Sequence, residues 1–99
     1  MNAGDPDDIL ADIRARFCTR MEKALESLRD AAQLPIEQSS LLLRAEAHKL
    51  AGVAATLGYG RVGTAAAKVD AIEGVSPDDP AVAALVLALN EAVAKGPQQ

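Results

Sequence analysis

Apolar side chains recur at helical spacing along the first third of the chain. Residues of this stripe stand mostly three or four positions apart, and they are Ile9, Ile13, Phe17, Met21, Ala24, Leu25 and Leu28. Such steps place side chains on one face of an α-helix. Asp5 and Pro6 suit the start of the helix, as an N-cap acceptor and a first helical residue. Pro35 disfavours helical angles at Leu34, so the pattern predicts a helix over residues 6–33.

Three further stripes predict helices over residues 36–58, 61–73 and 78–95. Their apolar positions are Leu43, Ala47, Leu50, Ala54 and Leu57, then Val62, Ala65, Ala66, Val69 and Ile72, and finally Val82, Leu85, Val86, Leu89 and Val93. Gly58 and Gly60 provide a stop and a turn, and Ser76 and Asp79 are candidate N-caps for the last helix. Connections this short make neighbouring helices antiparallel. The pattern predicts an all-α, antiparallel up-and-down four-helix bundle that forms one domain over residues 1–99.

Composition supports this fold class and excludes several functions. Alanine, the best helix former, accounts for 21 of the 99 residues. The net charge of −4 disfavours nucleic-acid binding, which needs a concentrated basic face. One cysteine and one histidine permit no internal disulfide and disfavour a zinc site. The acidic N-terminus does not resemble a signal peptide, and the longest apolar run, Ala81–Leu89, is far shorter than a bilayer span. We therefore expect a cytoplasmic protein without membrane contact.

His48 is the only histidine, and helix geometry predicts that it points away from the core. At about 100° per residue, the stripe of its helix averages about +20° from Leu50, whereas His48 falls at about 160°. Arg44 and Gly52 lie one turn before and after it on the same face. An imidazole is the side chain best suited to act as a base or nucleophile near pH 7. The competing interpretation is that His48 is an ordinary surface residue.

The helix face around His48 is small and apolar, where a solvent-facing helix normally carries charged side chains. Its members are Gly52, Ala51, Ala55, Ala45 and Leu41. A glycine within a helix costs about 1 kcal/mol relative to alanine, and Gly52 leaves a notch beside the imidazole. An exposed patch of this kind indicates a surface for a partner. The general abundance of alanine is the alternative explanation for the patch.

The segment from Ala47 to Gly58 resembles the signature of histidine-containing phosphotransfer (HPt) domains. In that signature a histidine is followed by an aliphatic residue, a glycine at plus four, small residues, and an aliphatic residue with glycine at plus nine and plus ten. The matching residues are His48, Leu50, Gly52, Ala54, Leu57 and Gly58. The resemblance extends over the whole chain, because HPt domains are four-helix bundles of about this length. Many members carry Lys or Arg at plus three, where this chain has Ala51.

The resemblance implies a role in two-component signalling. His48 would accept a phosphoryl group from the aspartyl phosphate of a receiver domain, in a response regulator or a hybrid histidine kinase, and pass it to another receiver. Lys49, Arg44 and Lys68 are candidates to offset the phosphoryl charge, and the face around Gly52 would dock the receiver. The receiver would bring Mg²⁺, so the chain needs no cofactor of its own. No ATP-binding region is present to support autokinase activity, and one site in a short bundle fits a monomer.

Other functions stay open beside this one. A helical adaptor could use the Gly52 face without chemistry, and it would gain no acid-labile, base-stable phosphate. The dimerisation helices of a histidine kinase are disfavoured, because Lys49 follows the histidine and no proline comes after it until Pro77. An acyl-carrier domain is disfavoured because Ser39 and Ser40 lack the flanking aspartate.

Four more residues have two interpretations each. Asp70 and Glu73 could orient a residue near His48 or be ordinary surface charges. Tyr59 could border the docking face or pack against a helix end. Cys18 is expected to fill space rather than act as a redox site.

Overall fold

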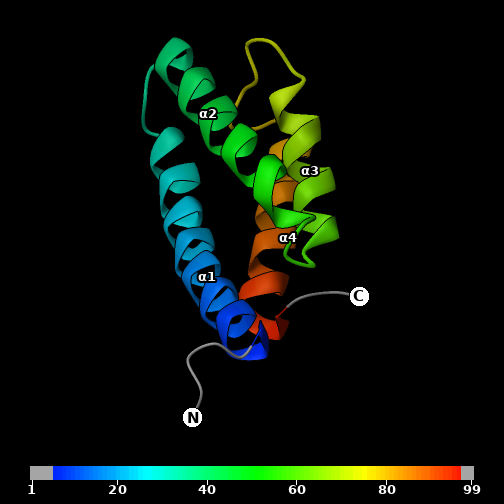
Figure 1. Cartoon of the computed structure of the whole chain (residues 1–99). Helices are drawn as coiled ribbons and strands as arrows, with labels where there is room; N and C mark the ends of the chain where they lie inside the picture. The colour runs from blue at the N-terminus through cyan, green and yellow to red at the C-terminus, as the bar shows by residue number, and fades with distance from the viewer. Residues whose placement is uncertain (1–5, 97–99) are drawn as a thin grey trace.

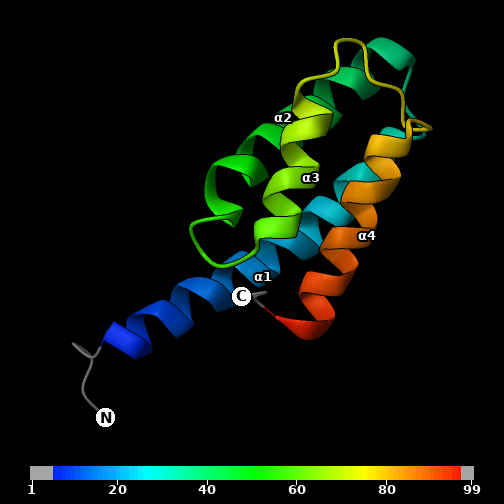
Figure 2. The ribbon, with the colours of Figure 1, turned by 90° about the vertical axis from the view of Figure 1, so that its right-hand side faces the viewer.

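The computed structural model describes residues 6–96 and consists of four α-helices joined by short connections (Figure 1). The helices are α1 (Pro6–Ala31), α2 (Ile36–Ala54), α3 (Gly60–Asp70) and α4 (Pro80–Lys95). Successive helices run antiparallel, as both views show (Figures 1 and 2). Contacts join α1 to α2, α2 to α3, α3 to α4 and α4 to α1, so the helices surround one core. The predicted all-α, up-and-down four-helix bundle is confirmed.

Three helices end at earlier residues than the apolar pattern predicted. Helix α1 ends at Ala31 rather than residue 33, because the next amides bond three residues back, as in Leu34 N–H to the Ala31 carbonyl at 3.2 Å. Helix α2 ends at Ala54 rather than residue 58, since Tyr59 N–H bonds to the Ala54 carbonyl at 2.8 Å and Gly58 adopts a φ of 92°. Helix α3 ends at Asp70 rather than residue 73.

The N-terminus of α4 resolves the choice between two candidate caps. Asp79 is the N-cap, because its side chain accepts a hydrogen bond from Ala81 N–H at 2.9 Å and Pro80 is the first helical residue. Ser76 instead accepts from Asp78 N–H at 3.2 Å, within the preceding turn. The helix therefore begins at residue 80, not 78. The cap predicted at Asp5 lies outside the described residues.

The apolar stripes meet in the core, except at the start of α1. Buried side chains come from all four helices and include Met21, Leu43, Leu50, Val69 and Leu85. Ile9 and Ile13 belong to the predicted apolar stripe of α1, but they are 49% and 43% exposed. They belong to the first two turns of α1, and the N-terminal end of this helix extends beyond the other helices (Figure 2).

Tyr59 lies in the connection between α2 and α3 and packs at that end of the bundle. Its ring lies 5.3 Å from that of Phe17, centroid to centroid, and is 3% exposed. Burial raises the pKa of Tyr59, and Cys18 adds to this shift while Arg14 opposes it. Arg14 also donates from Nε to the Leu57 carbonyl at 3.2 Å. Tyr59 therefore packs a helix end, which was one of its two predicted roles, and the half-buried Cys18 packs against the core.

Helices α2 and α3 approach closely because Gly63 stands at their contact. A Cβ atom at Gly63 would lie 3.4 Å from the Ala55 nitrogen and 3.5 Å from the Ala55 Cβ. The site is buried, so any longer side chain would push the two helices apart. This contact fixes the distance between the faces of α2 and α3.

We predict opposite effects for two substitutions at Gly63. Gly63→Ala should be neutral or stabilising by up to about 1 kcal/mol, because its Cβ meets only ordinary contacts and alanine favours the helix. Gly63→Leu should lower the free energy of unfolding by about 1–3 kcal/mol through overpacking. Urea unfolding followed by circular dichroism measures both. Equal stability of the two variants would contradict the close approach.

Candidate functional site

His48 lies on the outward face of α2, beside the end of α3. Its side chain is 79% exposed, which confirms the direction predicted from the helix wheel. The imidazole Nδ1 lies 3.0 Å from Oδ2 of Asp70, the last residue of α3, whose side chain is 33% exposed. The histidine is therefore accessible to a partner and yet held at one ring nitrogen.

The contact with Asp70 determines which nitrogen of His48 can act as a nucleophile. A carboxylate only accepts hydrogen bonds, so Nδ1 carries the proton and donates a hydrogen bond to Oδ2. In the neutral ring the lone pair then resides on Nε2, on the opposite edge from Asp70. The arrangement presents an orientated, unprotonated nitrogen at the protein surface, and it keeps a negative charge behind the ring.

Arg44 fastens the end of α3 to α2 one turn before His48. Its Nε donates to the backbone carbonyl of Asp70 at 3.1 Å, so the residue that holds the imidazole is itself anchored. Among the described residues this is the only hydrogen bond of the Arg44 side chain, and its two terminal nitrogens are available to an anion. The guanidinium is always charged and can bind phosphate oxygens in a forked geometry.

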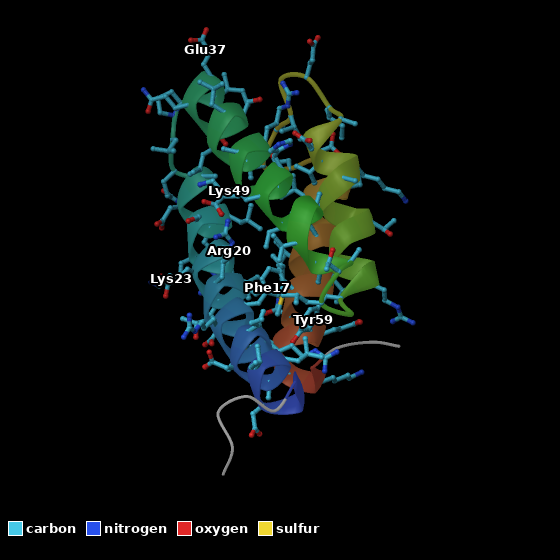
Figure 3. The ribbon with its side chains drawn as sticks, in the orientation of Figure 1. Phe17, Arg20, Lys23, Glu37, Lys49 and Tyr59 are labelled. Atoms are coloured by element: carbon cyan, nitrogen blue, oxygen red, sulfur yellow. The ribbon has the colours of Figure 1, made fainter. Side chains whose placement is uncertain are left out.

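The structure does not bring the other two predicted cations to the imidazole. Lys49 lies on the side of α2 that faces α1, about a quarter turn from His48 (Figure 3). Lys68 is about 200° around α3 from Asp70, and it lines a groove with Ala84 and Leu87 of α4. Of the three cations, only Arg44 forms a hydrogen bond with Asp70, the residue that contacts His48.

The predicted docking face is mostly exposed, with one exception. Leu41 is 71% exposed, and Ala45, Gly52 and Ala55 are exposed as well. These four residues are called the small-residue patch below. Ala51 was assigned to the same face, but it is half-buried and packs against the core. The reason is that α3 covers a wider sector of α2 than the apolar stripe alone indicated.

Gly52 is not required by the packing of this chain. A Cβ atom added there would meet no atom within 4 Å, and its φ lies outside the left-handed region that favours glycine. Any residue could therefore occupy this position in the isolated fold, and alanine would stabilise the helix. The notch at Gly52 faces solvent, and no contact within the described fold accounts for a glycine there.

The sequence left Asp70 with two interpretations, and the structure places it at the site beside His48. Its position three residues after Ala67 and two after Lys68 carries no sign of its partner, which lies 22 positions away on α2. The pairing of Asp70 with His48 becomes apparent only from the way α3 packs against α2. Glu73, weighed beside Asp70, lies beyond the end of α3 and is exposed.

The fold and the site together define a helical bundle with a single accessible histidine, held by a carboxylate from the next helix. The family model of the Hpt domain matches residues 12–96, so the chain belongs to the Hpt domain family. It therefore has a phosphotransfer role in two-component systems, in which it interacts with receiver domains or kinases. No curated protein and no solved structure matched the chain. None of the four described helices is long and apolar enough to span a membrane.

We predict that Asp70 sets the tautomer of His48. In the Asp70→Ala variant Nδ1 loses its acceptor, and the neutral ring should populate both tautomers. Two-bond ¹H–¹⁵N correlation spectra at a pH where the ring is neutral distinguish the tautomers. The matched control is Glu73→Ala, which removes a nearby exposed carboxylate and should leave the spectrum unchanged. Identical spectra for wild type and Asp70→Ala would contradict the assignment.

Proposed function

We propose that His48 is the phosphoacceptor of this Hpt domain and that Nε2 is the attacking nitrogen. The observation that carries the proposal is the 3.0 Å contact of Nδ1 with Asp70 on an imidazole that is 79% exposed. This contact leaves the lone pair on Nε2, where a large partner can reach it. The donor is the aspartyl phosphate of a receiver domain, and a second receiver takes the group in the next step.

The transfer balances without movement of a proton. A bond forms between Nε2 and phosphorus while the bond between phosphorus and the aspartyl oxygen breaks, and that oxygen leaves as a carboxylate. The ring keeps its proton on Nδ1 and becomes cationic, so the carboxylate of Asp70 stabilises the product. The reverse reaction with another receiver restores the neutral imidazole. Transfer in either direction requires close positioning of the two proteins.

Arg44 is the cation of this chain best placed to offset the phosphoryl charge. A phosphorylated side chain carries about −2 charges near pH 7. Arg44 lies one turn from His48, and its terminal nitrogens have no hydrogen-bond partner among the described residues. It takes the place of the Lys or Arg that many family members carry where this chain has Ala51. Mg²⁺ belongs to the receiver in this proposal, as expected from the sequence.

The small-residue patch serves as the docking surface for the receiver. Gly52 supports this assignment, since the fold itself gives no reason for a glycine there. A receiver that approaches Nε2 must pass close to this turn of α2, and the missing side chain allows the approach. An adaptor without chemistry could use the same patch, and the phosphate on His48 is what separates the two functions.

Phosphorylation of His48 is tested with two donors of different size. Phosphoramidate is a small donor that needs no docking, whereas receiver domains from the same genome, phosphorylated with acetyl phosphate, must dock. Wild type should gain an acid-labile, base-stable phosphate from both. His48→Gln should gain none and should keep the helical circular-dichroism spectrum. Labelling of His48→Gln would contradict the proposal, because another residue would then be the phosphoacceptor. No labelling of a folded wild type by either donor would leave the adaptor function.

Two substitutions at Gly52 separate docking from chemistry. Both Gly52→Ala and Gly52→Leu should be more stable than wild type, by roughly 0.5–1 kcal/mol, because nothing in the fold contacts the new side chain. Gly52→Leu should accept phosphate from phosphoramidate as wild type does but from a receiver about tenfold more slowly, a change of about 1.4 kcal/mol in the barrier. Gly52→Ala is the matched control and should lose much less. An unchanged receiver rate for Gly52→Leu would contradict docking at this patch.

A further inference from the structure

The first turns of α1 carry an apolar face that no other described helix covers. Ile9, Leu10 and Ile13 are 49%, 37% and 43% exposed, although they continue the stripe that is buried from Phe17 onward. Helix α1 has 26 residues and α2 has 19, so α1 extends past the end of the bundle (Figure 2). We call residues 8–13 the projecting segment. Three large apolar side chains on one exposed segment are typical of a surface that meets a partner.

A groove between α1 and α2 begins where the projecting segment ends. It has a volume of about 450 Å³ and an apolar floor formed by Ile13, Phe17, Val53 and Leu57. Its walls are basic and consist of Arg16, Arg20 and Lys23 from α1. Figure 3 labels Arg20 and Lys23 on α1. We call this the α1 groove. It is a basic surface on a chain whose net charge is −4.

The projecting segment has the chemistry that the α1 groove would bind. Beside its apolar residues it carries Asp8 and Asp12. Asp12 pairs with Arg16 of its own helix at 3.0 Å, but its side chain remains 60% exposed and that of Arg16 80% exposed. Asp8 and Asp12 thus precede the three basic residues of the groove wall along α1, and Glu22 lies among those basic residues. Two α1 helices placed side by side and antiparallel bring unlike charges together, whereas a parallel arrangement opposes like charges.

We propose that the α1 groove binds the projecting segment of a second copy of this chain. The two copies pack through antiparallel α1 helices around a two-fold axis, so each segment lies in the groove of the other. Such an interface is isologous and closes on itself as a dimer. It buries Ile9, Leu10 and Ile13 of both copies and places Asp8 and Asp12 beside the basic wall of the partner. The proposed dimer replaces the monomer that the size of the bundle suggested.

Sedimentation velocity of the full chain, from micromolar to submillimolar concentration, measures this association. Wild type should show a monomer–dimer equilibrium that weakens as salt is added. Ile9→Glu places a charge in the interface but lies outside the bundle, so it should raise the dimer dissociation constant by about tenfold or more without loss of helicity. The matched control is Leu87→Glu, at a 61% exposed apolar residue of α4, which should leave the equilibrium unchanged.

A mixing experiment tests the charge pairing itself. A variant with Asp8→Lys and Asp12→Lys, and a second with Arg16→Glu, Arg20→Glu and Lys23→Glu, should each be monomeric. An equal mixture should form dimers, because every segment then meets a groove of opposite charge. A monomeric wild type, a dimer that survives Ile9→Glu, or a mixture that stays monomeric would overturn the proposal. No receiver or phosphate is present, so the result is independent of the function proposed for His48.

Discussion

The contact between α2 and α3 is the constraint on which the site depends. Gly63 lets the two helices approach until a Cβ atom there would touch Ala55, and this spacing carries the end of α3 up to His48. The Arg44 side chain then donates a hydrogen bond to the Asp70 carbonyl, and the Asp70 carboxylate accepts a hydrogen bond from Nδ1 of His48. A surface imidazole, which would otherwise rotate freely, is thereby orientated from behind while its reactive edge faces solvent.

A four-helix bundle needs only a few additional features to support phosphoryl transfer. The reaction needs a positioned nucleophile, a counter-charge for the ring and a surface for the donor. In the proposed function, one carboxylate from a neighbouring helix meets the first two needs, and the missing side chain at Gly52 contributes to the third. Gly52 lowers the stability of α2 modestly relative to alanine. Because Gly52 faces solvent, the packing of the core is not affected.

The sequence was sufficient for the fold and for the exposure of His48, but not for the relations between helices. Apolar spacing predicts four helices and the outward direction of His48, because both depend on rotation within a single helix. The ends of α1, α2 and α3 depend on individual hydrogen bonds in the turns, and spacing does not reveal them. The Asp70 pair, the separation of Lys49 and Lys68 from the imidazole, and the half-burial of Ala51 all depend on how α3 rotates against α2. The exposed Ile9 depends on the unequal lengths of α1 and its neighbours.

The position of the phosphate on the imidazole tests the central claim most directly. Phosphorylated protein with ¹⁵N-labelled histidine can be studied by phosphorus and nitrogen NMR, which show the ring nitrogen that is bonded to phosphorus. We predict a single phosphohistidine at Nε2 of His48, with the proton retained on Nδ1 beside Asp70. Phosphate on Nδ1, or on a residue other than His48, would contradict it.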